Sequence, residues 1–323
     1  MATTSRQTLR VPHLGGTAVG YRTSTPNFDS TKPTVVLVNP FTATVDYYNA
    51  EFESHELTKA VNLIAIEPLG HGATVTKSET WTYWDSASVN LQLLDALGID
   101  RVFAVGTSQG GWIVTQMALL APERVGFFPP TMLQISSTVL IVDLQSIKIQ
   151  GLVVIGTSMD SESPRSRDLG CWDCPTATAG FVQLAADLTP KDDFEPGQDY
   201  YDYLMDIGHG KDADAPTRAF WAEIIRKTYQ GDEGKKKICM AAINLVSRDG
   251  LYERLPYIKC PVLWLHGTAD VVFTVANAQE GISHFVNSTD AQLVIIENGV
   301  HFLGASHQKE VQGHILDFTS RWK

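Results

Sequence analysis

The feature that most constrains the fold is a series of short, continuous apolar runs, most of which are followed by a segment with helical periodicity. The runs expected to form strands cover residues 34–38, 63–66, 102–105, 152–155, 261–265 and 292–296. Strands without polar alternation are typical of a sheet that is buried on both faces, and strand–helix alternation favours parallel strands. Residues 9–11 and 17–21 are expected to form an antiparallel pair ahead of them. The sequence therefore predicts the α/β class, with a mostly parallel sheet flanked by helices.

One long segment, residues 160–258, breaks this alternation. It is rich in Asp, Pro and aromatic residues, and then has helical periodicity over residues 215–229 and 234–246. We interpret the segment as a helical cap that is inserted after the fourth of the buried strands. The predicted organisation is thus a core formed by residues 1–159 and 259–323, with the cap between its two parts.

Residues 126–150 are an atypical insertion in the predicted core. They combine Gly, Pro and β-branched residues with almost no charge, and a loop this long and apolar is unusual inside a compact domain. Deleting them would join Val125 to Gly151 and bring the fourth strand directly after the preceding helix. Two explanations stay open, namely a retained intron in the gene model and a genuine hydrophobic insertion near the cap. Sequencing the transcript distinguishes them.

Composition and charge exclude several classes of protein. The chain has 323 residues, of which 44% are hydrophobic, and a formal net charge of −11 without a run of Lys or Arg. This acidic balance argues against nucleic acid or an anionic membrane as the main partner. No apolar stretch reaches about 18 residues, so we expect no membrane insertion. Residues 1–20 lack the apolar core of a secretory signal, so we expect a cytoplasmic location.

The sequence predicts neither a metal nor a cofactor. Its four cysteines are too few to suggest a disulfide framework in a chain of this length. Cys171 and Cys174 form a CxxC pair, but no second pair or His cluster follows, so a zinc site is not expected. The chain has no Walker A lysine, and no glycine-rich dinucleotide loop follows the first buried strand.

A G-x-S-x-G motif, residues 106–110, stands directly between the strand at 102–105 and a helix. The chemistry needs a very tight turn that lifts a serine off the end of the sheet. Small residues on either side let the strand and the helix approach each other, and the next backbone N–H points at the substrate oxygen. This strand–turn–helix context makes Ser108 the predicted nucleophile.

A serine hydroxyl is a poor nucleophile until a base removes its proton. Asp270 lies just past the strand at 261–265, and His301 lies in the loop after the last strand. Both positions are at carboxyl ends of strands, where active sites of open α/β sheets form, and they follow Ser108 in the order acid and then His. We therefore predict His301 as the base and Asp270 as the orienting acid. Asp160, which follows the fourth buried strand, is the alternative acid.

Together these motifs resemble the α/β-hydrolase superfamily, in its haloperoxidase- and esterase-like branch. The matching landmarks are residues 35–39, 67–72, 106–111, 267–270 and 299–301. The chain also looks like fungal α/β-hydrolases, including those of secondary-metabolite and toxin pathways. The resemblance implies an α/β-hydrolase fold with a helical cap. It also implies a serine hydrolase that cleaves a carboxylic ester, thioester or lactone through an acyl-serine.

The resemblance further implies an oxyanion hole built from two backbone N–H groups, which fall on Phe41 and Gln109. The family usually has His-Gly where this chain has Asn39 and Pro40. Proline supplies no N–H, but the donor falls on the residue after it, so the hole can survive. Glu67 stands where the family usually has an Asp before its Gly-His-Gly turn.

Other functional classes stay open, because this fold hosts many chemistries. One alternative is a triad-bearing member that acts as a C–C hydrolase, a lyase or a perhydrolase, and another is a non-catalytic ligand-binding member. The expected partner is a small to medium apolar molecule, because the cap is rich in aromatic residues that could line a pocket or pack the cap on the core. These residues are Trp172, Phe181, Phe194, Tyr200, Tyr201, Tyr203 and Trp221. The sequence leaves open whether the chain forms a homo-oligomer.

Overall fold

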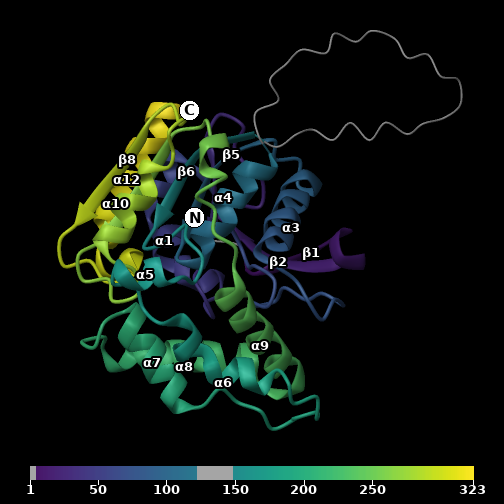
Figure 1. Ribbon diagram of the computed structural model, residues 1–323. Helices are drawn as coiled ribbons and strands as arrows, with labels where there is room; N and C mark the ends of the chain where they lie inside the picture. The colour runs from purple at the N-terminus through teal and green to yellow at the C-terminus, as the bar shows by residue number, and fades with distance from the viewer. Residues whose placement is uncertain (1–4, 122–147) are drawn as a thin grey trace, which may run out of the picture.

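A computed structural model describes residues 5–121 and 148–323 (Figure 1). Within them, eight strands form one sheet in the order β1-β2-β4-β3-β5-β6-β7-β8. The strands are β1 (Gln7–Val11), β2 (Thr17–Thr23), β3 (Thr34–Val38), β4 (Asn62–Ile66), β5 (Arg101–Thr107), β6 (Lys148–Ile155), β7 (Val262–Gly267) and β8 (Ala291–Ile296). β2 pairs antiparallel with both β1 and β4, and all the other neighbours are parallel. This confirms the predicted α/β class with a mostly parallel sheet.

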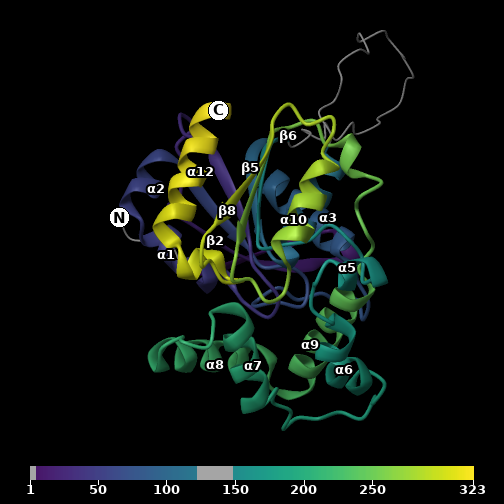
Figure 2. The same cartoon turned by 60° about the vertical axis from the view of Figure 1, so that its left-hand side comes forward.

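Helices cover both faces of the sheet (Figure 2). One face carries α1 (Asn49–Glu53), α2 (His55–Ala60) and α12 (Gln308–Trp322), and the other carries α3 (Tyr83–Ala96), α4 (Gln109–Leu120) and α10 (Val275–Ser283). In β3, Val35 belongs to the apolar cluster beneath α1, α2 and α12, whereas Val36 belongs to the cluster beneath α3, α4 and α10. Because both faces are buried in this way, the central strands are continuous apolar runs.

Residues 46–60 have helical periodicity, but they do not form one helix. The structure has a 3-10 helix, η2 (Val45–Tyr48), followed by the short helices α1 and α2. The break between α1 and α2 is at Ser54, whose backbone is extended, with φ −67° and ψ 109°. The Ser54 side chain accepts a hydrogen bond from the amide of Leu57 and so caps the start of α2.

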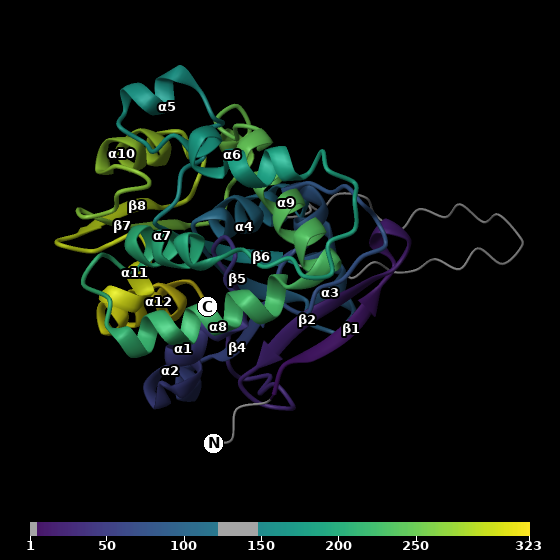
Figure 3. The same cartoon turned by 90° about the horizontal axis from the view of Figure 1, so that it is seen from below.

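A group of helices lies between β6 and β7 in the chain. They are α5 (Pro164–Asp168), α6 (Cys174–Leu184), α7 (Gln198–Gly208), α8 (Ala215–Tyr229) and α9 (Gly231–Ser247). Helices α6 to α9 form a layer below the sheet in Figure 1, and Figure 3 shows them in front of one end of the sheet. The contacts described below put them at the carboxyl end of the parallel strands. We keep the name cap for residues 160–258, and the exact division into core and cap stays a prediction.

The predicted insertion, residues 126–150, lies mostly outside the described residues. Its last three residues are described, and they form the start of β6, where Ile149 pairs with Val102 of β5. The register then shifts, because the next residue of β5, Phe103, pairs with Gly151. β6 thus begins earlier than its apolar run predicts.

The remaining helices are short. They are η1 (His13–Gly15), η3 (Leu255–Tyr257) and α11 (Leu303–Ser306). Across the described part of the chain, no helix combines the length and the apolar character that crossing a membrane requires.

Candidate active site

Ser108 lies at the tip of a tight turn between β5 and α4. Its φ of 53° is in the left-handed region, which residues other than glycine seldom adopt. A Cβ atom on Gly106 would lie 2.1 Å from the carbonyl oxygen of Gly110, and one on Gly110 would lie 2.1 Å from the carbonyl oxygen of Val38. Both glycines of the motif are therefore needed for the strand, the turn and the helix to pack this closely.

The predicted base and acid lie beside Ser108. Its Oγ is 3.0 Å from Nε2 of His301, and Nδ1 of His301 is 3.1 and 3.0 Å from the two carboxylate oxygens of Asp270. All three residues are buried. An Nδ1–H that donates to Asp270 leaves Nε2 of His301 free to accept the proton of Ser108. The structure thus brings the three predicted residues together in the geometry that proton transfer requires.

The carboxylate of Asp270 is fixed by its own loop. Its Oδ1 accepts hydrogen bonds from the amides of Val272, at 2.8 Å, and Phe273, at 3.0 Å. Burial by itself would raise the pKa of Asp270, but attraction to His301 and His266 outweighs burial and holds that pKa below its ordinary value. Asp270 is therefore ionised at neutral pH and can orient His301.

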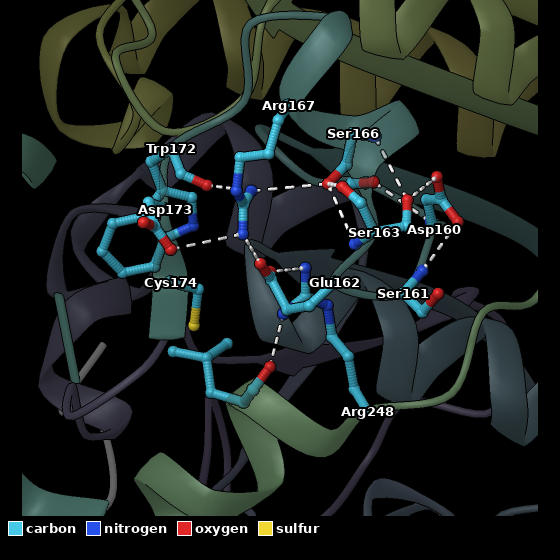
Figure 4. A network of polar contacts seen from close by, with 12 residues as sticks. Asp160, Ser161, Glu162, Ser163, Ser166, Arg167, Trp172, Asp173, Cys174 and Arg248 are labelled. Atoms are coloured by element: carbon cyan, nitrogen blue, oxygen red, sulfur yellow. Dashed lines mark hydrogen bonds and ion pairs between the residues drawn. The ribbon is translucent and has the colours of Figure 1, made fainter. Parts of the chain in front are cut away.

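The alternative acid, Asp160, has other partners (Figure 4). One of its carboxylate oxygens accepts from the amide of Ser161 at 2.8 Å, and the other accepts from the hydroxyl of Ser163 at 3.2 Å. Among the described residues, Asp160 forms no hydrogen bond with His301, whose Nδ1 faces Asp270 instead. The geometry therefore favours Asp270 as the partner of His301.

Phe41, the first predicted oxyanion donor, belongs to a tight turn after β3. The amide of Ala43 closes the turn by donating to the carbonyl of Pro40 at 3.2 Å. The side-chain amide of Asn39 donates to the carbonyls of Pro40 and Ala43, at 3.1 and 2.8 Å. Thr42 in this turn has φ 54°, a conformation that costs a residue other than glycine about 1–3 kcal/mol. The amide of Phe41 donates to no described residue, so it is available to a ligand.

Gln109, the second predicted donor, is the first residue of α4, so its amide has no partner within the helix. Its side-chain Nε2 donates to Nε2 of His71 at 2.8 Å, and its Oε1 accepts from the Tyr83 hydroxyl at 3.2 Å. Nδ1 of His71 in turn donates to the carbonyl of Leu69 at 2.9 Å. Burial lowers the pKa of His71 to about 4, so the ring is neutral and has the one donor and one acceptor that these contacts need. Sequence reasoning missed Tyr83, because helical periodicity carries no sign of this contact.

The fold and part of the sequence match known proteins. A family model described as alpha/beta hydrolase fold matches residues 33–126, a range that contains Ser108. The structure of an esterase from Thermogutta terrifontis superimposes with a TM-score of 0.71 at 15% identity, over 98% of this chain and 98% of that one. The chain has the α/β-hydrolase fold.

Further relatives share parts of this pattern. The enol-lactonase from Burkholderia xenovorans LB400 has the same α/β-hydrolase fold, with a TM-score of 0.68 at 17% identity over 97% of this chain and 100% of that one. In sequence, the chain is 30% identical over 92 residues to the dihydrolipoyllysine-residue acetyltransferase component of the acetoin cleaving system of Cupriavidus necator. That match covers 28% of this chain and 24% of the relative, so the chain spans about a quarter of the relative's length.

Within the α/β-hydrolase fold, the cap begins and ends in a buried ion-pair network (Figure 4). Glu162, which follows β6, forms ion pairs with both Arg167 and Arg248. Arg167 also donates to the carbonyl of Trp172, and the guanidinium of Arg248 lies over the ring of Trp112 in α4, 4.6 Å from its centroid. Because Arg248 follows α9, the network joins the two ends of the cap to each other and to α4.

The described residues contain no group of three or more His, Cys, Asp or Glu side chains placed to hold a metal ion. Cys171 and Cys174 are buried free thiols. Burial raises the pKa of both thiols, so both are protonated at neutral pH.

The buried His71 should make stability depend on pH. Its pKa is lowered to about 4 in the folded chain, so between pH 6.5 and 4 the unfolded chain binds a proton that the folded chain excludes. The contribution of the neutral His71 ring to the free energy of unfolding is fully present above pH 6.5 and is lost as the pH falls towards 4. In the wild type, this proton uptake should lower the free energy of unfolding by about 2 kcal/mol between pH 7 and pH 5. His71→Asn removes the titrating ring, so this part of the fall should be absent from the variant.

Urea denaturation at both pH values measures this difference. His55→Asn, at an exposed position at the start of α2, is the matched control. Equal pH dependence in the wild type and in His71→Asn would show that the folded chain takes up the proton on His71, contrary to the neutral ring that its two contacts require.

Proposed function

We propose that the protein is a serine hydrolase that cleaves a carboxylic ester, thioester or lactone of a small to medium apolar molecule through an acyl-serine. The observation that carries this proposal is the buried hydrogen-bonded chain from Ser108 through His301 to Asp270. The amides of Phe41 and Gln109, which donate to no other described residue, supply the remaining groups. A nucleophile, a base, an orienting acid and two N–H donors are what acyl transfer needs.

In the proposed reaction, Nε2 of His301 takes the proton of Ser108 while Oγ attacks the carbonyl carbon of the substrate. The amides of Phe41 and Gln109 donate to the negatively charged oxygen that develops. The imidazolium of His301, stabilised by Asp270, then gives its proton to the leaving alcohol or thiol, and the acyl-serine forms. Water that His301 deprotonates hydrolyses the acyl-serine by the same steps.

An apolar substrate is favoured by the surroundings of His301. The ring of Phe302 packs against His301, with centroids 5.5 Å apart, and His209 of the cap lies edge-on to Phe302 at 5.2 Å. Phe41 belongs to an apolar cluster with residues of α6 and α9, such as Ala241. Apolar surroundings of this kind suit an apolar acyl or alcohol group. The likeness to an esterase and an enol-lactonase supports the same reaction class.

A fluorophosphonate probe followed by an ester panel tests the proposal. We expect one label per chain on Ser108 in the folded protein and no label in Ser108→Ala, because only an activated serine reacts. We also expect hydrolysis of p-nitrophenyl esters of short and medium acyl chains.

Two outcomes would contradict the proposal in different ways. Absence of label on Ser108 in folded protein would favour the alternative of a non-catalytic ligand-binding protein. A labelled protein that hydrolyses no ester, thioester or lactone would instead favour a C–C hydrolase, a lyase or a perhydrolase.

The resemblance of the sequence motifs to fungal hydrolases leads us to propose further that the substrate belongs to secondary metabolism. The genomic neighbourhood tests this part. A polyketide synthase gene beside the coding sequence would support it, and a neighbourhood without biosynthetic genes would count against it.

A further inference from the structure

The two proposed oxyanion donors differ in their contacts with the cap. Gln109 is held by His71 and Tyr83, which both precede the cap in the chain and belong to the core. The ring of Phe41 lies edge-on to His71, with centroids 6.2 Å apart, but it also packs in an apolar cluster whose other buried members all come from the cap. These members are Cys174, Ala241, Ala242 and Leu245.

The residue next to Phe41 has a polar contact with the cap as well. Oγ1 of Thr42 lies 2.8 Å from the phenolic oxygen of Tyr200 in α7, and either atom can be the donor. Thr42 is fully buried, and the ring of Tyr200 is in turn held edge-on against Phe181 of α6, with centroids 4.9 Å apart. A left-handed threonine persists only when surrounding contacts hold it. The hydrogen bond between the hydroxyls of Thr42 and Tyr200 is a contact of this kind, and the cap supplies one of the two hydroxyls.

We infer that Tyr200 is a positioning residue, which holds the strained turn at Thr42 and thereby aims the N–H of Phe41 at the substrate oxygen. The cap then completes one half of the oxyanion hole, while the core holds the other half through Gln109. This inference rests on the proposed function. It means that a displacement of α7 would disturb the Phe41 donor more than the Gln109 donor.

Tyr200→Phe tests the inference, because it removes the hydroxyl and keeps the ring. We expect kcat for a p-nitrophenyl ester to fall about 10-fold while KM changes less than about 2-fold, since the contact acts on the transition state. Tyr201→Phe is the control, because Tyr201 is the next residue on the same helix. The Tyr201 hydroxyl donates to Glu195 within the cap at 2.9 Å, so this variant should keep the wild-type kcat.

The other side of the contact gives a second set of variants. Thr42→Val should reproduce the loss in kcat, and Thr42→Ser, which keeps the hydroxyl, should retain most of the activity. The double variant Tyr200→Phe/Thr42→Val should be no slower than either single variant, because all three lack the same contact. Additive losses in the double variant would overturn the inference.

A trifluoromethyl ketone separates positioning from a merely structural role. Its adduct with Ser108 puts an oxyanion in the hole, so its Ki should rise about 10-fold in Tyr200→Phe, in step with the loss in kcat. A merely structural role would lower the midpoint of thermal unfolding without raising Ki relative to KM, and that result would overturn the inference.

Hydrogen exchange gives a readout that does not depend on turnover. The amide of Ala43, whose hydrogen bond to Pro40 closes the turn, should exchange faster in Tyr200→Phe than in Tyr201→Phe, and equal exchange would contradict the inference. Failure of the inference and failure of the proposed function are therefore distinct. A wild type that is labelled and active, with an unchanged Tyr200→Phe variant, overturns the inference alone. An unlabelled wild type overturns the proposed function, and faster exchange in Tyr200→Phe would still support the role of Tyr200 in holding the turn.

Discussion

Replacing Ser108 by alanine is expected to lower kcat/KM for the best p-nitrophenyl ester by about 10⁴-fold or more. The substitution removes Oγ, the atom that forms the acyl bond in the proposed reaction. Alanine has the same Cβ atom as serine, so the strain of the turn at φ 53° is unchanged and the free energy of unfolding should change little. Steady-state kinetics measures the loss, and circular dichroism with urea denaturation checks the fold.

His301→Ala should cause a loss of the same size, because Oγ of Ser108 lies 3.0 Å from Nε2 of His301 and has no other base in contact among the described residues. The double variant should be about as slow as either single variant, since residues that act as a unit are not additive. Folded Ser108→Ala that keeps more than about 1% of the wild-type rate would contradict the assignment of the nucleophile.

The second large effect is expected at the acid. Asp270→Asn should lower kcat by about 10³- to 10⁴-fold, because an amide at this position can hold His301 in the wrong tautomer and cannot stabilise the imidazolium. The side-chain oxygen of the new residue can still accept from the amides of Val272 and Phe273, so the loop should keep its shape. The measurement is the kcat of the purified variant, with folding checked by circular dichroism.

Asp160→Asn is the control for this substitution. The carboxylate of Asp160 accepts from the Ser161 amide and the Ser163 hydroxyl, and an amide side chain can keep part of these contacts. Its kcat should therefore stay within about 3-fold of the wild type. If Asp160→Asn were the inactive variant, the acid would be Asp160, after β6, and our assignment of Asp270, after β7, would be wrong. If neither variant lost activity, another group would have to orient His301.

Much of the fold and the grouping of the site residues were predictable from physical rules. Central strands such as β3 and β5 are continuous apolar runs because both of their faces are buried. Ser108, Asp270 and His301 were expected to lie close together because the carboxyl ends of neighbouring parallel strands share one edge of the sheet. The structure has their side chains within hydrogen-bond distance, and their catalytic roles stay predictions.

Contacts between distant segments were not predictable in the same way. Thr42 and Tyr200 are 158 positions apart, and their contact depends on how α7 packs against the core, which helical periodicity does not specify. The break at Ser54 was hidden for a different reason. Apolar residues lie at helical spacing on each side of it, and the boundary itself is set by the local cap on the Leu57 amide.

The buried network at the base of the cap bears on how such a protein can change during evolution. The side chains of Glu162 and Arg248 are only 9% and 1% exposed, and losing Glu162 would leave the guanidinium of Arg248 buried without its carboxylate partner. Glu162 precedes α5 and Arg248 follows α9, so the two junctions of the cap have to be inherited together. Recombination that exchanges the cap between relatives should therefore succeed when both crossover points fall outside residues 162–248. A crossover between these positions would take residue 162 from one parent and residue 248 from the other, so the two buried charges would not match in a pair of relatives that differ there.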